Sequence, residues 1–167
     1  MAQISEPLRS SHKRAGFSCG NEMLDNYLHK QANQDIKRKL AACFVLNDIE
    51  TNLLKGYYTL SNAGIPFDLL PSTIQKKLSL SYSSIPATLL GRLAIDKRFQ
   101  GNGIGKLLLI DALKRSHDIS KSIASFVVIV DPIDKPAENF YAQYGFIKLP
   151  DSGKMFLPMR TVSQLFG

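Results

Sequence analysis

Runs of apolar residues with strand-like spacing recur along the chain, separated by stretches whose apolar positions have the helical period. Strands are expected at 41–46, 53–60, 89–95 and 125–130. A short first strand at Ile4–Pro7 and closing strands at 146–149 and 155–159 complete the set. Residues 61–86 contain several prolines and a serine-rich run, which indicates irregular structure with a short helix at 72–78.

Helices are indicated between these strands. Asn21 is a good N-cap, and Leu24, Tyr27 and Leu28 fall on one face of the helix that follows. Later helices are expected at 104–116 and at 137–144, the second ended by Gly145. The order β-α-α-β-β-β-α-β-α-β-β and the length of 167 residues predict one α/β domain over 1–167, an α+β arrangement with a central mixed sheet flanked by helices.

The stretch from Leu89 to Ser116 has the layout of an anion site: a strand, a glycine-rich loop and a helix. Glycines at 101, 103 and 105 let the backbone approach a phosphate without Cβ atoms in the way. Amide groups in the first helical turn have no intrahelical partner, and the helix dipole adds positive charge there. A glycine turn that binds no ligand is the simpler alternative.

Two familiar phosphate loops do not fit this stretch. A Walker A loop would need a glycine where Gln100 stands and a hydroxyl where Leu107 stands. A dinucleotide fingerprint would need a third glycine where Lys106 or Leu108 stands. The pattern that does fit is Q-x-x-G-x-G, formed by Gln100, Gly103 and Gly105, which resembles the acyl-CoA loop of the GNAT acetyltransferase superfamily.

A second motif strengthens the resemblance. Many GNAT enzymes end their last helix with A-x-x-F-Y-x-x-x-G-F, which stands here as Ala137, Phe140, Tyr141, Gly145 and Phe146. The resemblance implies that Tyr141 protonates the departing coenzyme A thiolate, a role suited to a phenol of pKa about 10. A core aromatic is the alternative. Many relatives carry Asn where this chain has Asp134, so that cofactor contact is in question.

The resemblance also implies the GNAT acyl-CoA N-acyltransferase fold and acetyl-CoA as cofactor. In the family, strand four separates from strand five and its free backbone groups pair with the pantetheine arm. The cofactor-binding positions implied by the family pattern are Leu93, Ala94, Ile95, Arg98, Gln100, Gly101, Asn102, Gly103, Ile104, Gly105 and Lys106.

Charge adds a further indication. The formal net charge is +7, and the basic excess is concentrated between residues 76 and 115, where only Asp96 and Asp111 are acidic. Its members are Lys76, Lys77, Arg92, Lys97, Arg98, Lys106, Lys114 and Arg115. Such an excess is typical of surfaces that bind polyanions, although a solvated basic surface without a partner has the same composition.

The N-terminal half narrows the resemblance. The pattern F-x-C-G-N-x-x-L-D-x-Y-L at 17–28, with GYYTL at 56–60 and IPATLLGRLAID at 85–96, is similar to the TacT-type acetyltransferase toxins of bacterial toxin–antitoxin modules. Those enzymes acetylate the α-amino group of aminoacyl-tRNA, block translation and are neutralised by a ribbon-helix-helix antitoxin; family members often form dimers. Tentative tRNA-binding residues are Lys76, Lys77, Arg92 and Lys97.

Two alternatives stay open: a GNAT enzyme that acetylates a protein or small-molecule amine, and a non-catalytic nucleic-acid-binding or docking protein. Cys19 and Cys43 are too few and too isolated for a disulfide framework or a metal site, and no metal is expected. Cys19 has no histidine placed to activate it and is interpreted as a turn residue rather than a nucleophile. No apolar run approaches the roughly 20 residues of a membrane span, so a cytoplasmic protein is expected.

Overall fold

The computed structural model describes residues 2–79 and 81–167, which form two compact units. One comprises residues up to Ser61 together with Gly91–Arg115, and the other comprises Asn62–Leu90 with Ser116–Gly167. A seven-stranded sheet has the order β1-β2-β3-β4-β5-β7-β6. The strands are β1 Glu6–Pro7, β2 Ala42–Asn47, β3 Leu54–Pro66, β4 Ser84–Ile95, β5 Val127–Val130, β6 Ile147–Lys148 and β7 Met155–Pro158.

The helices lie between these strands or after the last of them. They are α1 Glu22–Asn26, the π-helix η1 Tyr27–Gln31, α2 Ala32–Lys37, the 3-10 turn η2 Phe67–Leu69, α3 Ser72–Gln75, the 3-10 turn η3 Lys97–Phe99, α4 Ile104–Ser120, α5 Lys135–Gln143 and α6 Met159–Leu165. No helix among residues 2–79 and 81–167 is long and apolar enough to cross a membrane.

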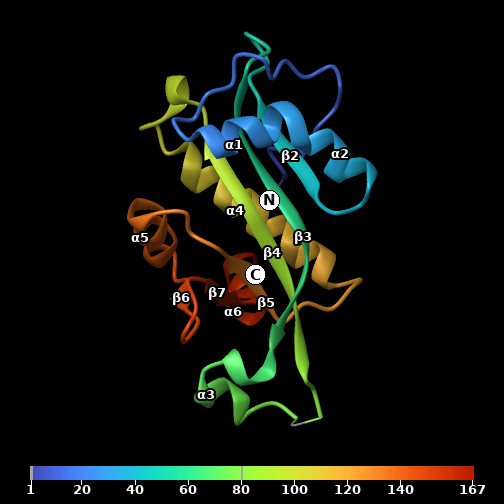
Figure 1. Ribbon diagram of the computed structural model, residues 1–167, viewed down its shortest axis with the longest axis vertical. Helices are drawn as coiled ribbons and strands as arrows, with labels where there is room; N and C mark the ends of the chain where they lie inside the picture. The colour runs from blue at the N-terminus through green and yellow to red at the C-terminus, as the bar shows by residue number, and fades with distance from the viewer. Residues whose placement is uncertain (1, 80) are drawn as a thin grey trace. The chain divides into compact units, whose positions relative to one another are not determined.

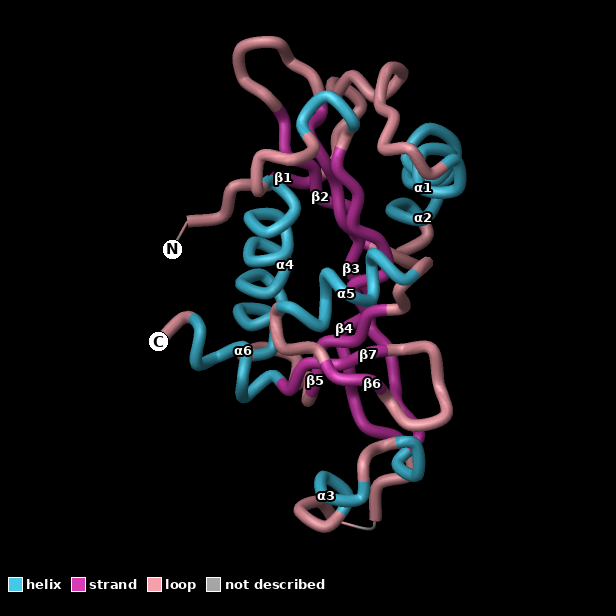
Figure 2. The backbone as a smooth tube through the Cα atoms, turned by 90° about the vertical axis from the view of Figure 1, so that its left-hand side faces the viewer, coloured by secondary structure: helices cyan, strands magenta, loops and turns pink. Residues whose placement is uncertain are grey.

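In the first unit, β2 pairs antiparallel with both β1 and β3. Helices α1 and α2 lie on one face of β2 and β3, and α4 lies on the opposite face (Figures 1 and 2). Leu28, Val45 and Tyr57 are fully buried between the first helices and the strands. Gly56 allows close packing, because a Cβ there would lie 3.1 Å from the Leu108 side chain of α4. This packing brings α4 close to β3.

Asp111 explains why a carboxylate interrupts the otherwise apolar helix α4. It is 1% exposed and accepts hydrogen bonds from the Ile4 amide at 2.7 Å, the Tyr58 hydroxyl at 2.9 Å and the Ser5 hydroxyl. Arg115, one turn later, donates to the Tyr58 hydroxyl at 2.9 Å. The buried carboxylate therefore anchors the N-terminal segment to α4, and its hydrogen bonds offset the cost of burying the charge.

In the second unit, β5 pairs parallel with β4 over Ala87–Leu90 and antiparallel with β7, which in turn pairs with β6. All four residues of β5 are buried, as its unbroken apolar sequence predicts. Phe156 and Ile129 belong to the core of this unit. Figure 1 shows α3 in the segment that joins the ends of β3 and β4.

The fold class is confirmed, but several boundaries differ from those predicted. The prediction that residues 61–86 are irregular is wrong at both ends, because β3 continues to Pro66 and β4 already begins at Ser84. Ile65 and Ile85 are buried there, and Gly64 permits the close approach of Ser84. The C-terminal helix α6 was not predicted; it has only Met159 and Val162 as buried residues, so its pattern is weak. Helix α4 also extends to Ser120 rather than Ser116.

Candidate active site

The glycine-rich loop between η3 and α4 has the open backbone that an anion site needs. Gly101 and Gly103 have φ values of 84° and 76°, in the left-handed region that favours glycine. A Cβ added at either residue would meet no atom within 4 Å. The amide of Leu107 donates to the Gly103 carbonyl at 3.2 Å, so amides earlier in this first turn have no partner at the i−4 position. The start of α4 can therefore receive a phosphate.

Asp96 fixes the start of this loop through hydrogen bonds to its carboxylate. Its carboxylate is almost completely buried and accepts hydrogen bonds from the Ser18 amide at 3.1 Å and the Arg98 amide at 2.9 Å. The Arg98 guanidinium adds two more, each of 2.9 Å. Burial alone would raise the pKa of Asp96, but these hydrogen bonds together lower its pKa below the ordinary value. Sequence reasoning counted Asp96 only as an opposing charge and missed this role.

Arg98 and Gln100, both expected to bind the cofactor, have structural partners. Arg98 forms the ion pair with Asp96. The Gln100 side-chain amide donates to the carbonyl of Cys19 at 2.9 Å and to the carbonyl of Ile95 at 2.8 Å. The Gln100 side chain therefore joins the turn before α1 to the end of β4. In this structure its hydrogen bonds position the glycine-rich loop.

Beyond Leu90, no strand that the structure describes pairs with the β5 side of β4. Pairing with β5 ends at Leu90 and Val130, whereas β4 continues to Ile95. The Ala94 carbonyl faces β3, since a Cβ on Gly56 would lie 2.7 Å from it. Because successive residues of a strand direct their backbone groups to opposite edges, those of Leu93 and Ile95 face away from β3. The Ile95 carbonyl already accepts a hydrogen bond from the Gln100 side chain. The backbone groups of Leu93 are therefore more available for hydrogen bonds with a ligand.

Cys19 is not a nucleophile in this structure. The pKa of the Cys19 thiol is raised to about 11, mainly by burial and secondly by a hydrogen bond with Asp25. The reactive form of cysteine is the thiolate, which is scarce at neutral pH when the pKa is this high. The sequence-based interpretation of Cys19 as a turn residue agrees with this environment.

Tyr141 lies in α5 of the second unit, where its side chain is 7% exposed. The rings of Phe140 and Phe146 pack edge-on against it, each with a centroid distance of 5.3 Å. Burial raises the pKa of Tyr141 above the ordinary phenol value, so the hydroxyl is protonated at neutral pH. Asp134, the departure from the family pattern, accepts a hydrogen bond from the Ala137 amide at 2.9 Å and so caps α5.

The basic residues fall into two groups. Arg92 is half-buried, with its guanidinium carbon 3.5 Å from the ring centroid of Tyr27, and Arg115 is held beside Tyr58. Within the basic stretch 76–115, four described lysines are exposed and have no ion-pair partner within 4 Å, and these are Lys76, Lys77, Lys97 and Lys106. Lys76 and Lys77 belong to the second unit and follow α3. The lysines, rather than the arginines, are therefore the freely accessible cations.

Comparison with known proteins matches this architecture to acetyltransferases. Residues 81–161 match the model of the acetyltransferase (GNAT) domain. A probable toxin TacT from Sinorhizobium fredii is 32% identical over 174 residues, which cover 99% of this chain and 96% of that protein. A tRNA-acetylating toxin from Mycobacterium tuberculosis is 29% identical over 170 residues, covering 100% of this chain and 99% of that protein.

Solved structures of similar toxins support the same match to acetyltransferases. A tyrosine-to-phenylalanine mutant of KacT has a TM-score of 0.91 at 32% identity, covering 99% of this chain and 100% of that one. AtaT complexed with acetyl-methionyl-tRNAfMet has a TM-score of 0.89 at 28% identity, with coverage of 99% and 100%. A mutant AtaT bound to acetyl-CoA and the C-terminus of the antitoxin AtaR has a TM-score of 0.80 at 26% identity, with coverage of 97% and 96%. The chain belongs to the GNAT acetyltransferase superfamily, within the group of TacT-type toxins.

Proposed function

We propose that this protein is an acetyl-CoA-dependent N-acetyltransferase that acetylates the α-amino group of aminoacyl-tRNA and so blocks translation. The observation that carries the proposal is the open glycine loop at the start of α4, in a chain that is similar over its whole length to tRNA-acetylating toxins. An N-acetylated aminoacyl group has no free amine with which to form a peptide bond.

The loop would hold the cofactor pyrophosphate through backbone amides of residues 101–106, supported by the helix dipole and by Lys106. Arg98 and Gln100 contribute by fixing the loop to Asp96, Cys19 and Ile95. Backbone groups of Leu93 and Ile95 are the candidates for pairing with the pantetheine arm, and Ala94 contributes a small buried side chain beside them. Acetyl-CoA would supply the thioester that is attacked.

The acetyl transfer requires no covalent enzyme intermediate. The neutral α-amine would attack the thioester carbonyl, so that the new C–N bond forms and the C–S bond breaks. The proton that the amine nitrogen loses passes through solvent and replaces the one that Tyr141 gives to the thiolate. Tyr141 donates its hydroxyl proton to the departing thiolate, a transfer that needs the phenol protonated, as its raised pKa ensures. The α-amine of an aminoacyl ester has a lower pKa than a lysine side chain, so it is neutral more often at neutral pH.

The proposed acceptor, aminoacyl-tRNA, is a polyanion, and the accessible lysines carry the opposite charge. Lys76, Lys77 and Lys97 would contact tRNA phosphates, and Arg92 would add positive charge from its half-buried place beside Tyr27. An antitoxin, of the ribbon-helix-helix type in this family resemblance, would neutralise the protein, as AtaT binds AtaR. Because aminoacyl-tRNA is the proposed substrate, we expect the protein to act in the cytoplasm, and a homodimer is a further expectation.

The direct test is mass spectrometry of charged tRNA incubated with the protein and acetyl-CoA. We expect one acetyl group on the α-amine of the attached amino acid, and none when acetyl-CoA is omitted. If a lysine-containing peptide is acetylated while charged tRNA stays unmodified under the same conditions, the proposal is wrong.

A further inference from the structure

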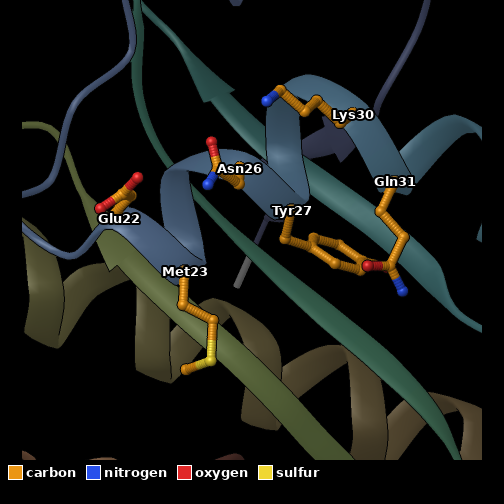
Figure 3. A pocket seen from close by; sticks show the side chains of 6 residues that line it. All are labelled: Glu22, Met23, Asn26, Tyr27, Lys30 and Gln31. Atoms are coloured by element: carbon orange, nitrogen blue, oxygen red, sulfur yellow. The ribbon is translucent and has the colours of Figure 1, made fainter.

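A groove of about 570 Å³ runs along the outer side of α1 and η1 in the first unit. Its lining residues are Glu22, Met23, Asn26, Tyr27, Lys30 and Gln31. Figure 3 shows them in two rows, with Glu22, Asn26 and Lys30 in one row and Met23, Tyr27 and Gln31 in the other. Within each row the residues are four apart in sequence, as neighbours on a helical surface are.

The π-helical turn is the local reason for this surface. The Ala32 amide donates to the Tyr27 carbonyl, five residues back, so the turn contains one residue more than an α-helical turn. Such π turns inside helices occur frequently at functional sites. Tyr27 and Gln31, the first and last residues of this turn, both line the groove.

The floor of the groove is fixed, whereas its polar rim has no partners. The Tyr27 hydroxyl donates to Asp35 at 2.8 Å, and Arg92 covers the Tyr27 ring. By contrast, the side chains of Glu22, Asn26, Lys30 and Gln31 form no hydrogen bond or ion pair with any residue that the structure describes. Met23 adds an apolar side chain that is 63% exposed. A rigid base with free donors, acceptors and an exposed thioether has the character of a ligand site.

We propose that this groove binds the 3′-terminal adenosine of aminoacyl-tRNA, an inference that rests on the proposed function. The amides of Asn26 and Gln31 offer the paired donor and acceptor that recognise an adenine edge. The Met23 thioether packs favourably against an aromatic ring, and Lys30 provides a cation for the adjoining phosphate. The Glu22 carboxylate can accept a hydrogen bond from the ribose hydroxyl that distinguishes RNA.

The test compares two acceptors that share one α-amine: the 3′-O-aminoacyl ester of adenosine 5′-phosphate and the methyl ester of the same amino acid. We expect kcat/KM to favour the nucleotide ester by about tenfold or more, because a site with free polar groups rejects an acceptor that leaves them unpaired. The variant Asn26→Ala/Gln31→Ala should bring the ratio close to one, and Lys30→Ala should lower it partly. The matched control is Gln34→Ala/Lys37→Ala on α2, outside the groove, which should keep the wild-type ratio.

Equal turnover of the two esters by the wild type, or an unchanged ratio in Asn26→Ala/Gln31→Ala, would overturn the inference. So would groove variants that weaken only the binding of an antitoxin peptide, since the groove would then be a protein-docking surface. The proposed function fails separately and visibly: charged tRNA and both esters would remain unacetylated while a lysine peptide reacts.

Discussion

The guanidinium group of Arg98 donates two hydrogen bonds, each of 2.9 Å, to the buried carboxylate of Asp96. The same carboxylate accepts a hydrogen bond from the backbone amide of Ser18, which is 78 residues away in sequence. This pair therefore links the end of β4, the turn before α1 and the start of the glycine loop. A loop held in this way needs little reorganisation when it binds a phosphate, and such preorganisation favours affinity.

Removing the carboxylate charge should destabilise the protein. We expect Asp96→Asn to lower the free energy of unfolding at pH 7 by about 1–3 kcal/mol, because the Arg98 side chain, itself half-exposed, loses its partner. Denaturant unfolding measures the difference. The comparison variant is Asp134→Asn, which changes the same group to the same amide at the exposed cap of α5, where Asn caps about as well as Asp.

The effect of Asp96→Asn should depend on pH. The folded protein holds the pKa of Asp96 below its unfolded value of about 3.9, so this stabilisation is complete above that pH. It is lost as the pH falls through the lower folded pKa, where the carboxylate takes up a proton. The stability difference between wild type and Asp96→Asn should therefore shrink below about pH 4. A constant difference from pH 7 to the acid limit of folding would contradict this account of Asp96.

The glycine loop should bind acetyl-CoA through its backbone. Asp and Asn are nearly equal in shape and both tolerate the left-handed φ of 76° at residue 103, so Gly103→Asp and Gly103→Asn differ mainly in charge. We expect calorimetry to show acetyl-CoA binding weakened about tenfold or more by Gly103→Asp relative to Gly103→Asn, because a carboxylate would face the pyrophosphate. Equal affinities in the two folded variants would remove this loop from the cofactor site.

Tyr141 should act through its hydroxyl. Tyr141→Phe keeps the ring that packs on Phe140 and Phe146, so we expect the fold and acetyl-CoA affinity to persist. Turnover should fall by roughly 10²–10⁴-fold if proton donation is needed. Tyr144→Phe, the same change three residues later on the same helical segment, is the control and should retain activity. A fully active Tyr141→Phe would mean that water protonates the thiolate.

Lys76 and Lys77 should matter only for the nucleic acid. Replacing both with Glu should reduce turnover of charged tRNA and flatten its dependence on salt, because fewer counterions are released on binding. Acetyl-CoA affinity should not change, since neither lysine lies in the glycine loop. Lys13→Glu/Lys37→Glu makes the same change in net charge at two other exposed positions and should leave the salt dependence as it is. A salt dependence altered equally by both double variants would indicate a diffuse charge effect.

The parts of the site that the sequence predicted are those with a local signal. The spacing of Gln100, Gly103 and Gly105 after an apolar strand identified the loop, and the positive φ values of Gly101 and Gly103 explain why glycines stand there. The FVVIV run identified β5 because a strand buried on both faces needs apolar residues at every position. These features depend on neighbours in sequence, so they can be read from one chain.

Long-range pairings carried no such signal. The contact of Asp96 with Ser18 and that of Asp111 with Ile4 join distant segments, and no periodicity in the sequence marks them. Arg92 was named a tentative tRNA-binding residue, because its sequence neighbours do not reveal the Tyr27 ring that it covers. The π turn at Tyr27–Gln31 differs from an α-helix by one hydrogen-bond register, a change that leaves the apolar pattern almost intact.

The central claim is that the acceptor is the α-amine of aminoacyl-tRNA, and a comparison of initial rates tests it most directly. Charged tRNA, an amino-acid methyl ester and a lysine peptide would be supplied separately, each with acetyl-CoA, at low and at moderate salt. We predict that charged tRNA is acetylated fastest and that only its rate falls steeply as salt rises, because phosphate contacts hold it. Fastest acetylation of the lysine peptide, with charged tRNA inert at both salt concentrations, would contradict the account.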